Sequence, residues 1–349
     1  MIKRDLNIDI MRIIACIMII IIHVSSELLL NFNPSTYTWN ISNIFDSLSR
    51  SAVPIFVMIT GILLLNPKKE ISIKRLYLKY IPKMILVLFI ASLFYSLWYC
   101  FGLHMYNFSL GNYIKYTIIG PYHLWYFSVI FFLYIITPVA KIVTSSDKNN
   151  ISKYILGILI ISSILYTIQD CRFMPYFEYI NLLLEKMYYK NILFWGSYYL
   201  IGHYIYNTNE LDKYKRIIYV LGIVGLFFCI TLTRYDSIKY NTYNFPFYNN
   251  FGFPVYVMSI ALIYLMKNIK IKHKKIIDIL SKSTFGIYII HLFVLQLLNT
   301  SFHVYTLKLN TVFLIPLISI LVFVISLMVV LIFSFLKNVC IIKQHKHQT

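Results

Sequence analysis

Charged residues are scarce in this sequence. Asp, Glu, Lys and Arg together make up 13% of the 349 residues, about half of the ~25% that is usual in soluble domains. Acidic residues are the rarest, with 13 Asp and Glu against 32 Lys and Arg. Hydrophobic residues make up 59% of the chain, and the mean hydropathy is +0.70. This composition excludes a soluble globular enzyme and indicates a protein that crosses a membrane many times.

The sequence also lacks closely spaced cysteines and internal repeats, which argues against several classes of protein. The five cysteines are widely scattered and form no CxxC pair, so we expect neither a disulfide framework nor a metal site. The sequence shows no internal repeat, which disfavours a transporter built from inverted repeats. It also shows no segment long enough for a separate soluble domain. Residues 1–349 are therefore predicted to form one membrane domain.

Ten apolar runs approach the ~20 residues that a membrane-spanning helix needs. They predict an all-α, polytopic helix bundle with spans at about 8–30, 44–65, 80–101, 124–143, 152–169, 192–206, 215–234, 251–267, 284–299 and 312–336.

The distribution of basic residues predicts the orientation of these spans. With the N-terminus in the cytoplasm, 23 of the 32 Lys and Arg residues fall in cytoplasmic segments and 8 in external ones, and Arg12 lies inside the first span. This asymmetry follows the positive-inside rule, so both termini are predicted to be cytoplasmic. It accounts for the net charge of +19 without a nucleic-acid partner and predicts contact with anionic lipid headgroups.

The first span, MRIIACIMIIIIHVSSE at 11–27, carries Arg12, His23 and Glu27. Arg12 and His23 differ by about 20° around a helix and by about 16 Å along it. Asp9 and Glu27 extend the same stripe. Because ionisable groups inside a membrane are costly, the stripe predicts a water-filled or protein-lined cavity. The structural alternatives are an Arg12 that snorkels beside Asp9, a solvated Glu27, and a His23 that is bonded to a neighbouring helix.

Other polar residues lie in or beside later spans. The candidates are Arg50, Lys74, Arg75, His123, Trp125, Tyr288 and His291. The basic loop with Lys74 and Arg75 suits an anionic cytosolic donor, although such loops often only set the topology. Interface anchoring, an aromatic belt and a buried hydrogen bond between helices are the structural alternatives for the other candidates.

Four stretches resemble, in order and spacing, the acyltransferase-3 family of bacterial integral-membrane acyltransferases. They are RDLNIDIMRIIACIMIIIIH, SRSAVPIFVMITGILL, YHLWYFSVIFFLYIITP and FGIYIIH. The likeness is greatest to the branch with the enterobacterial-common-antigen O-acetyltransferase and the membrane domain of the vancomycin-resistance serine racemase. The resemblance implies about ten helices in a bacterial plasma membrane. It also implies transfer of an acyl group, usually acetyl from cytosolic acetyl-CoA, to hydroxyls of cell-surface carbohydrates or their lipid-linked precursors.

The resemblance assigns an essential role to His23, eleven residues after Arg12, and its motifs include Arg50, Arg75, His123 and Trp125. We expect His23 to act as general base with Glu27 as its partner. Arg12 is expected to contribute to catalysis and, together with Lys74 and Arg75, to bind the acyl-CoA co-substrate, and no permanently bound cofactor is expected. Arg50, His123, Trp125, Tyr288 and His291 are expected near the substrates. A transporter of a small solute or glycan precursor, and a scaffolding subunit, are the competing hypotheses.

Overall fold

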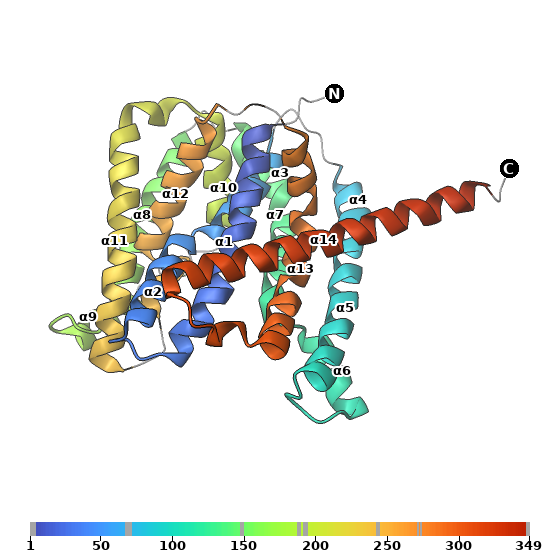
Figure 1. The fold of residues 1–349 in the computed structure, drawn as a ribbon. Coiled ribbons are helices and arrows are strands. Elements are labelled where there is room, and N and C mark those ends of the chain that lie inside the picture. The colour runs from blue at the N-terminus through green and yellow to red at the C-terminus, as the bar shows by residue number, and fades with distance from the viewer. Residues whose placement is uncertain are drawn as a thin grey trace.

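The computed structural model describes residues 5–66, 72–146, 150–186, 190, 195–241, 245–270, 272 and 274–346. Within these residues the chain is all-α, as the sequence predicted (Figure 1). Nine of the described segments are long and apolar enough to cross a membrane. The protein is therefore a multi-pass integral membrane protein.

The helices follow one another without strands in the described residues. In chain order they are α1 (Leu6–Asn31), α2 (Tyr37–Ser49), α3 (Ala52–Leu64), α4 (Ile73–Arg75), α5 (Ile81–Leu97), α6 (Leu110–Ile119), α7 (Tyr126–Ser146), α8 (Asn150–Asp170), α9 (Phe177–Lys186), α10 (Trp195–Asn207), α11 (Lys215–Tyr240), α12 (Phe253–Lys267), α13 (Lys275–Phe302) and α14 (Thr311–Lys346).

Local signals in the sequence set where several helices begin. The Asp5 side chain accepts a hydrogen bond from the backbone N–H of Asn7 at the start of α1, and Thr36 accepts one from Trp39 at the start of α2. Such caps satisfy backbone donors that have no partner inside the helix. Pro254 occupies the first turn of α12, where a missing N–H does no harm.

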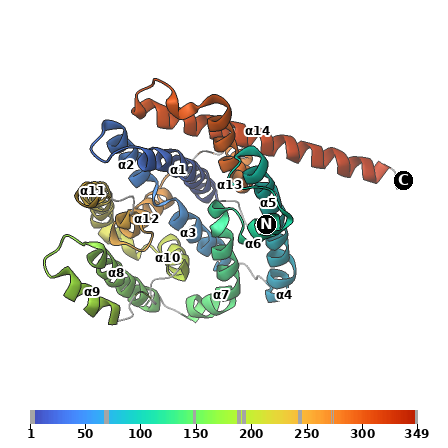
Figure 2. The ribbon, with the colours of Figure 1, turned by 90° about the horizontal axis from the view of Figure 1, so that it is seen from below.

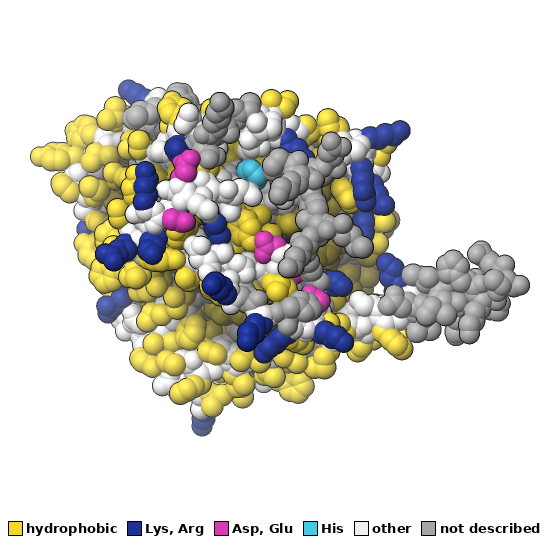
Figure 3. Space-filling model, turned by 90° about the horizontal axis from the view of Figure 1, so that it is seen from above, with side chains coloured by type: hydrophobic (Ala, Val, Ile, Leu, Met, Phe, Trp, Pro, Cys, Tyr) yellow, Lys and Arg dark blue, Asp and Glu magenta, His cyan; other side chains and the backbone are white. Residues whose placement is uncertain are grey.

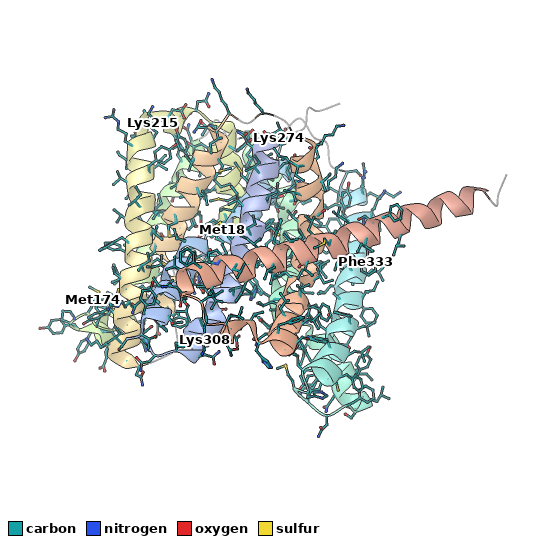
Figure 4. All side chains as sticks on the ribbon, in the orientation of Figure 1. Met18, Met174, Lys215, Lys274, Lys308 and Phe333 are labelled. Carbon is teal, nitrogen blue, oxygen red and sulfur yellow. The ribbon has the colours of Figure 1, made fainter. Side chains whose placement is uncertain are left out.

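The bundle has two ends, which we call the N-terminal face and the distal face. The N-terminal face lies at the start of α1 (Figure 1) and carries Lys215 and Lys274, and the distal face carries Met174 and Lys308 (Figure 4). Lys and Arg side chains are spread over the N-terminal face (Figure 3). In the view from the distal side, α3 lies near the centre with α1, α12, α10 and α7 around it (Figure 2).

Two predicted spans differ from the observed helices. The second one, 44–65, is divided at Arg50 and Ser51 into α2 and α3, so the bundle has a polar break inside a predicted membrane segment. The sixth one, 192–206, corresponds to α10, whose 13 residues are too few to span a bilayer core. Most of α10 is buried inside the bundle, so it does not need the length of a lipid-facing helix. Residues 192–194 lie outside the described residues.

Helices α3 and α10 pack closely through two glycines. A Cβ atom added at Gly61 would lie 1.9 Å from the carbonyl oxygen of Tyr199, and one added at Gly202 would lie 2.5 Å from the Cα of Met58. These contacts involve backbone atoms, so the neighbours cannot move aside without moving a helix. Small residues therefore let the two central helices approach each other, as is common in membrane bundles.

We predict that Gly202→Ala lowers the free energy of unfolding by about 1–3 kcal/mol, because overpacking forces the two helices apart. Gly157→Ala in α8 is the matched control, since a Cβ atom there would meet nothing within 4 Å. We expect that change to stay within about 0.5 kcal/mol of the wild type. Unfolding of both variants in detergent micelles measures the difference. Equal stability of the two variants would contradict the packing role of Gly202.

Candidate active site

Three histidines from distant parts of the sequence come together inside the bundle. His23 lies on α1, His123 on the 3-10 turn η3 (Tyr122–Trp125), and His291 on α13. The ring centroids of His23 and His291 are 5.1 Å apart, those of His123 and His291 are 5.5 Å apart, and those of His23 and His123 are 6.5 Å apart. The sequence predicted these residues one by one, and the fold assembles them into one histidine cluster.

Backbone carbonyl oxygens lie beside two members of the histidine cluster, His291 and His123. His291 Nδ1 lies 2.7 Å from the carbonyl oxygen of Tyr288, so we infer that this nitrogen carries the proton, because a carbonyl only accepts. His291 Nε2 is then a proton acceptor, and it is buried without a partner among the described residues. His123 Nδ1 is buried in the same way, while its Nε2 lies 3.4 Å from the Ile289 carbonyl. Such unsatisfied buried nitrogens suit a substrate or a water molecule.

A cavity of about 480 Å³ lies between the N-terminal face and the histidine cluster. Arg12, Lys83 and Lys282 line it near the starts of α1, α5 and α13, so three cations surround its outer part. Phe56, Thr60, Tyr126, Phe127 and Tyr288 are among the residues that line it deeper in the bundle. We call this space the inner cavity. It combines a cationic mouth with an apolar and aromatic interior.

A buried ion pair supports the distal half of the site. The Arg50 guanidinium at the break between α2 and α3 pairs with the carboxylate of Asp46, which is fully buried. Asp46 also accepts a hydrogen bond from the Ser25 hydroxyl on α1 at 3.1 Å. The guanidinium carbon of Arg50 stacks 4.0 Å from the ring centre of Tyr248, and His23 lies within electrostatic range of Arg50. The pair therefore links α1 and α2 beside the histidine cluster.

The remaining predicted residues are not part of the histidine cluster. Glu27 is exposed toward the distal face, where its carboxylate accepts a hydrogen bond from Asn31 at 3.2 Å. Trp125 is 43% exposed and packs against Trp195 with ring centroids 5.5 Å apart. Lys74 and Arg75 lie on α4 and are not among the described residues that line the inner cavity. Arg75 instead contacts the ring of Tyr80.

Two residues that sequence reasoning missed take the place expected for Lys74 and Arg75. Lys83 belongs to the same basic stretch, eight residues beyond Arg75, and Lys282 precedes the FGIYIIH motif. Both residues line the inner cavity. Neither was singled out: Lys83 ends the basic loop that was expected to suit an anionic donor, and Lys282 was counted only as a residue that sets the topology. Their proximity to Arg12 results from the packing of α1, α5 and α13, which a pattern along one helix does not reveal.

The distal side of the histidine cluster is rich in tyrosine. Tyr122 lies against His23, with ring centroids 6.0 Å apart. The pKa of Tyr305 is raised, mainly because the side chain is buried and to a smaller extent because the Glu27 carboxylate and Tyr122 lie nearby. The Tyr305 hydroxyl therefore stays protonated and neutral at physiological pH. Neutral hydroxyls and aromatic rings beside an exposed carboxylate suit a polar, uncharged ligand such as a sugar.

Metal-binding geometry is not found in the described residues, where no group of three or more His, Cys, Asp or Glu side chains is arranged to hold an ion.

A sequence profile for the acyltransferase domain of the acyltransferase-3 family matches residues 5–338. The chain belongs to the acyltransferase-3 family. This match covers α1 to nearly the end of α14, including every residue of the histidine cluster and the inner cavity. Neither a curated protein nor a solved structure gives a significant match.

Membership of the acyltransferase-3 family identifies the protein as a membrane acyltransferase. The matched acyltransferase domain consists of the membrane-spanning helices described above. In this bundle the histidine cluster supplies proton acceptors, and the inner cavity supplies a cationic space beside it.

We predict that Asp46→Ala lowers the free energy of unfolding by about 3–5 kcal/mol, because it leaves the Arg50 charge without its buried partner. The control is Glu210→Ala, which removes an ion pair with Lys153 whose side chains are 40% and 49% exposed. We expect a loss of about 0–1 kcal/mol there. Unfolding curves of the purified variants in detergent give both values. Similar losses in the two variants would show that the buried Asp46–Arg50 pair stabilises the fold no more than an exposed ion pair does.

Proposed function

We propose that this protein is an O-acyltransferase that moves an acyl group from cytosolic acyl-CoA to a hydroxyl of a cell-surface carbohydrate or its lipid-linked precursor, with His23 as general base. The observation that carries this proposal is the position of the histidine cluster. It lies between the cationic inner cavity on one side and the tyrosine-rich distal side on the other. A donor and an acceptor therefore approach the same imidazoles from opposite faces.

The N-terminal face is the cytoplasmic face in this proposal, in the plasma membrane of a bacterium. Its lysines and arginines (Figure 3) agree with the positive-inside rule. An acyl-CoA carries several phosphate charges, so the three cations around the inner cavity attract it and hold it. Lys74 and Arg75, on the short helix at the same face, add to the field that guides it. Acetyl-CoA, a cytosolic thioester, is the donor we expect.

The reaction needs one proton to leave the acceptor hydroxyl. His23, as neutral imidazole, takes that proton while the hydroxyl oxygen forms a bond to the carbonyl carbon of the thioester. The tetrahedral intermediate then breaks its C–S bond, which leaves the O-acyl ester and the thiolate of CoA. The thiolate recovers the proton from the His23 imidazolium. A general base of this kind is typically worth 10²–10⁴-fold in rate.

The neighbours of His23 suit its role. His291 presents an unprotonated Nε2 to the histidine cluster, so it is positioned to orient an N–H of His23 or to share the acceptor's proton. This assigns to His291 the orienting role that the sequence suggested for Glu27, which is exposed on the distal side near Tyr122 and Tyr305. There a carboxylate is suited to hydrogen bonds with carbohydrate hydroxyls. Arg50, held by Asp46, supplies positive charge near the developing oxyanion.

We expect His23→Ala to reduce acyl transfer by about 10²–10⁴-fold, because the base is lost while the substrate cavities remain. His104→Ala is the matched control, since His104 is an exposed histidine outside the cluster and its loss should leave transfer unchanged. The assay measures radiolabelled acetyl from acetyl-CoA in the surface-glycan fraction of membranes that express each variant. A folded His23→Ala protein with wild-type transfer would disprove the general-base assignment.

The donor site gives a second expectation. Replacing both Lys83 and Lys282 by Ala should raise the KM for acetyl-CoA by about tenfold, because two contacts to phosphate groups are lost, with a smaller change in kcat. The wild-type KM should rise with salt concentration, and that dependence should weaken in the double variant. Lys215→Ala, on the same face but outside the inner cavity, serves as control. An unchanged KM in the double variant would place the donor elsewhere.

A further inference from the structure

Three aromatic rings close the deep end of the inner cavity. The ring centroids of Phe56 and Tyr126 are 6.1 Å apart, and those of Tyr126 and Tyr288 are 6.0 Å apart. They come from α3, α7 and α13, and all three side chains line the inner cavity. We call this layer the aromatic partition. It joins three helices that surround the space through which the acyl group has to pass.

Tyr288 is the member of the aromatic partition that also touches the histidine cluster. Its ring stacks on His291 with centroids 6.0 Å and planes 27° apart. Its hydroxyl donates a hydrogen bond of 2.6 Å to the carbonyl oxygen of His123, which holds the ring in place. None of the three histidines is among the described residues that line the inner cavity. Tyr288 is therefore the ring of the aromatic partition that lies between the inner cavity and the histidine cluster.

We propose that the aromatic partition sets the length of the acyl group that reaches His23, so that the protein transfers acetyl and rejects acyl chains of four or more carbons. This inference rests on the proposed function, because it concerns the donor of that reaction. A two-carbon group needs only small displacements of the rings to reach the histidine side. Each additional methylene has to displace aromatic side chains that are already packed, which is unfavourable in a dense interior.

Phe56 is the best member of the aromatic partition to change. It has no polar side-chain atom, so removing its ring leaves the hydrogen bond between Tyr288 and His123 intact. Phe56→Ala opens space beside Tyr126, and Phe56→Leu opens less. The matched control is Phe251→Ala, which removes a half-buried ring that packs against Trp195 and Tyr198 outside the inner cavity. It tests whether general loosening of the bundle has the same effect.

The experiment compares transfer of radiolabelled acetyl and butanoyl groups from their CoA thioesters to the surface glycan of membranes that express each variant. We expect the wild type to favour acetyl by at least about tenfold, the scale on which pockets discriminate methylene groups. Phe56→Ala should lower that ratio by about tenfold, Phe56→Leu should lower it less, and Phe251→Ala should keep it. Each ratio is internal to one variant, so lower expression does not change it.

Two results would overturn the inference while leaving the proposed function in place. One is a wild type that transfers acetyl and butanoyl equally well. The other is a pair of folded Phe56 variants that transfer acyl groups with the wild-type ratio. A wild type that transfers neither group from CoA would instead refute the proposed function, and the inference would fall with it.

Discussion

The absence of water from the membrane interior is the constraint on which the rest of this structure depends. A polar side chain in hydrocarbon has no solvent partner, so it has to find one inside the protein or line a wet cavity. Asp46 and Arg50 meet this constraint by pairing with each other, with additional contacts to Ser25 and Tyr248. The histidines meet it only in part, since buried ring nitrogens of His123 and His291 have no partner among the described residues. Arg50 Nε also lacks a hydrogen-bond partner among the described residues, but the charge of Arg50 is balanced by Asp46, whereas the imidazole nitrogens remain available to a ligand.

The same constraint explains the shape of the bundle's centre. Short helices such as α3 and α10 are tolerated because other helices, not lipid, cover most of their surface. Gly61 and Gly202 allow these two helices to touch through their backbones. The break at Arg50 is then tolerated, because Asp46 pairs with Arg50 inside the protein and Ser25 donates a hydrogen bond to Asp46. The interruption puts Arg50 beside the histidine cluster. An unbroken apolar helix would not place a charged side chain at this position.

The sequence revealed the parts of this protein that depend on one helix at a time. Long apolar runs predicted the membrane segments, and helical spacing predicted the shared stripe of Arg12 and His23, because both depend on local geometry. The meeting of His23, His123 and His291 was not predictable in this way, since it depends on how α1, η3 and α13 pack. Lys83 and Lys282 were missed for the same reason. The division of the second span did leave a signal in the sequence, since Asp46, Ser49 and Arg50 are polar. A ruler of about 20 residues joins them to the apolar run that follows, so the segment was predicted as one span.

The arrangement of the inner cavity favours chemistry over transport. A transporter needs a route that carries its substrate past the middle of the membrane, usually with broken helices in two related halves. Here the cationic cavity is lined by aromatic rings, one of which, Tyr288, is held by a hydrogen bond to the carbonyl oxygen of His123. A large anionic donor that enters from the N-terminal face can present a small group at this layer, but its charged part stays with Arg12, Lys83 and Lys282. In the proposed reaction, only the small acyl group passes the aromatic partition. The histidines beyond it then accept the proton of the acceptor hydroxyl.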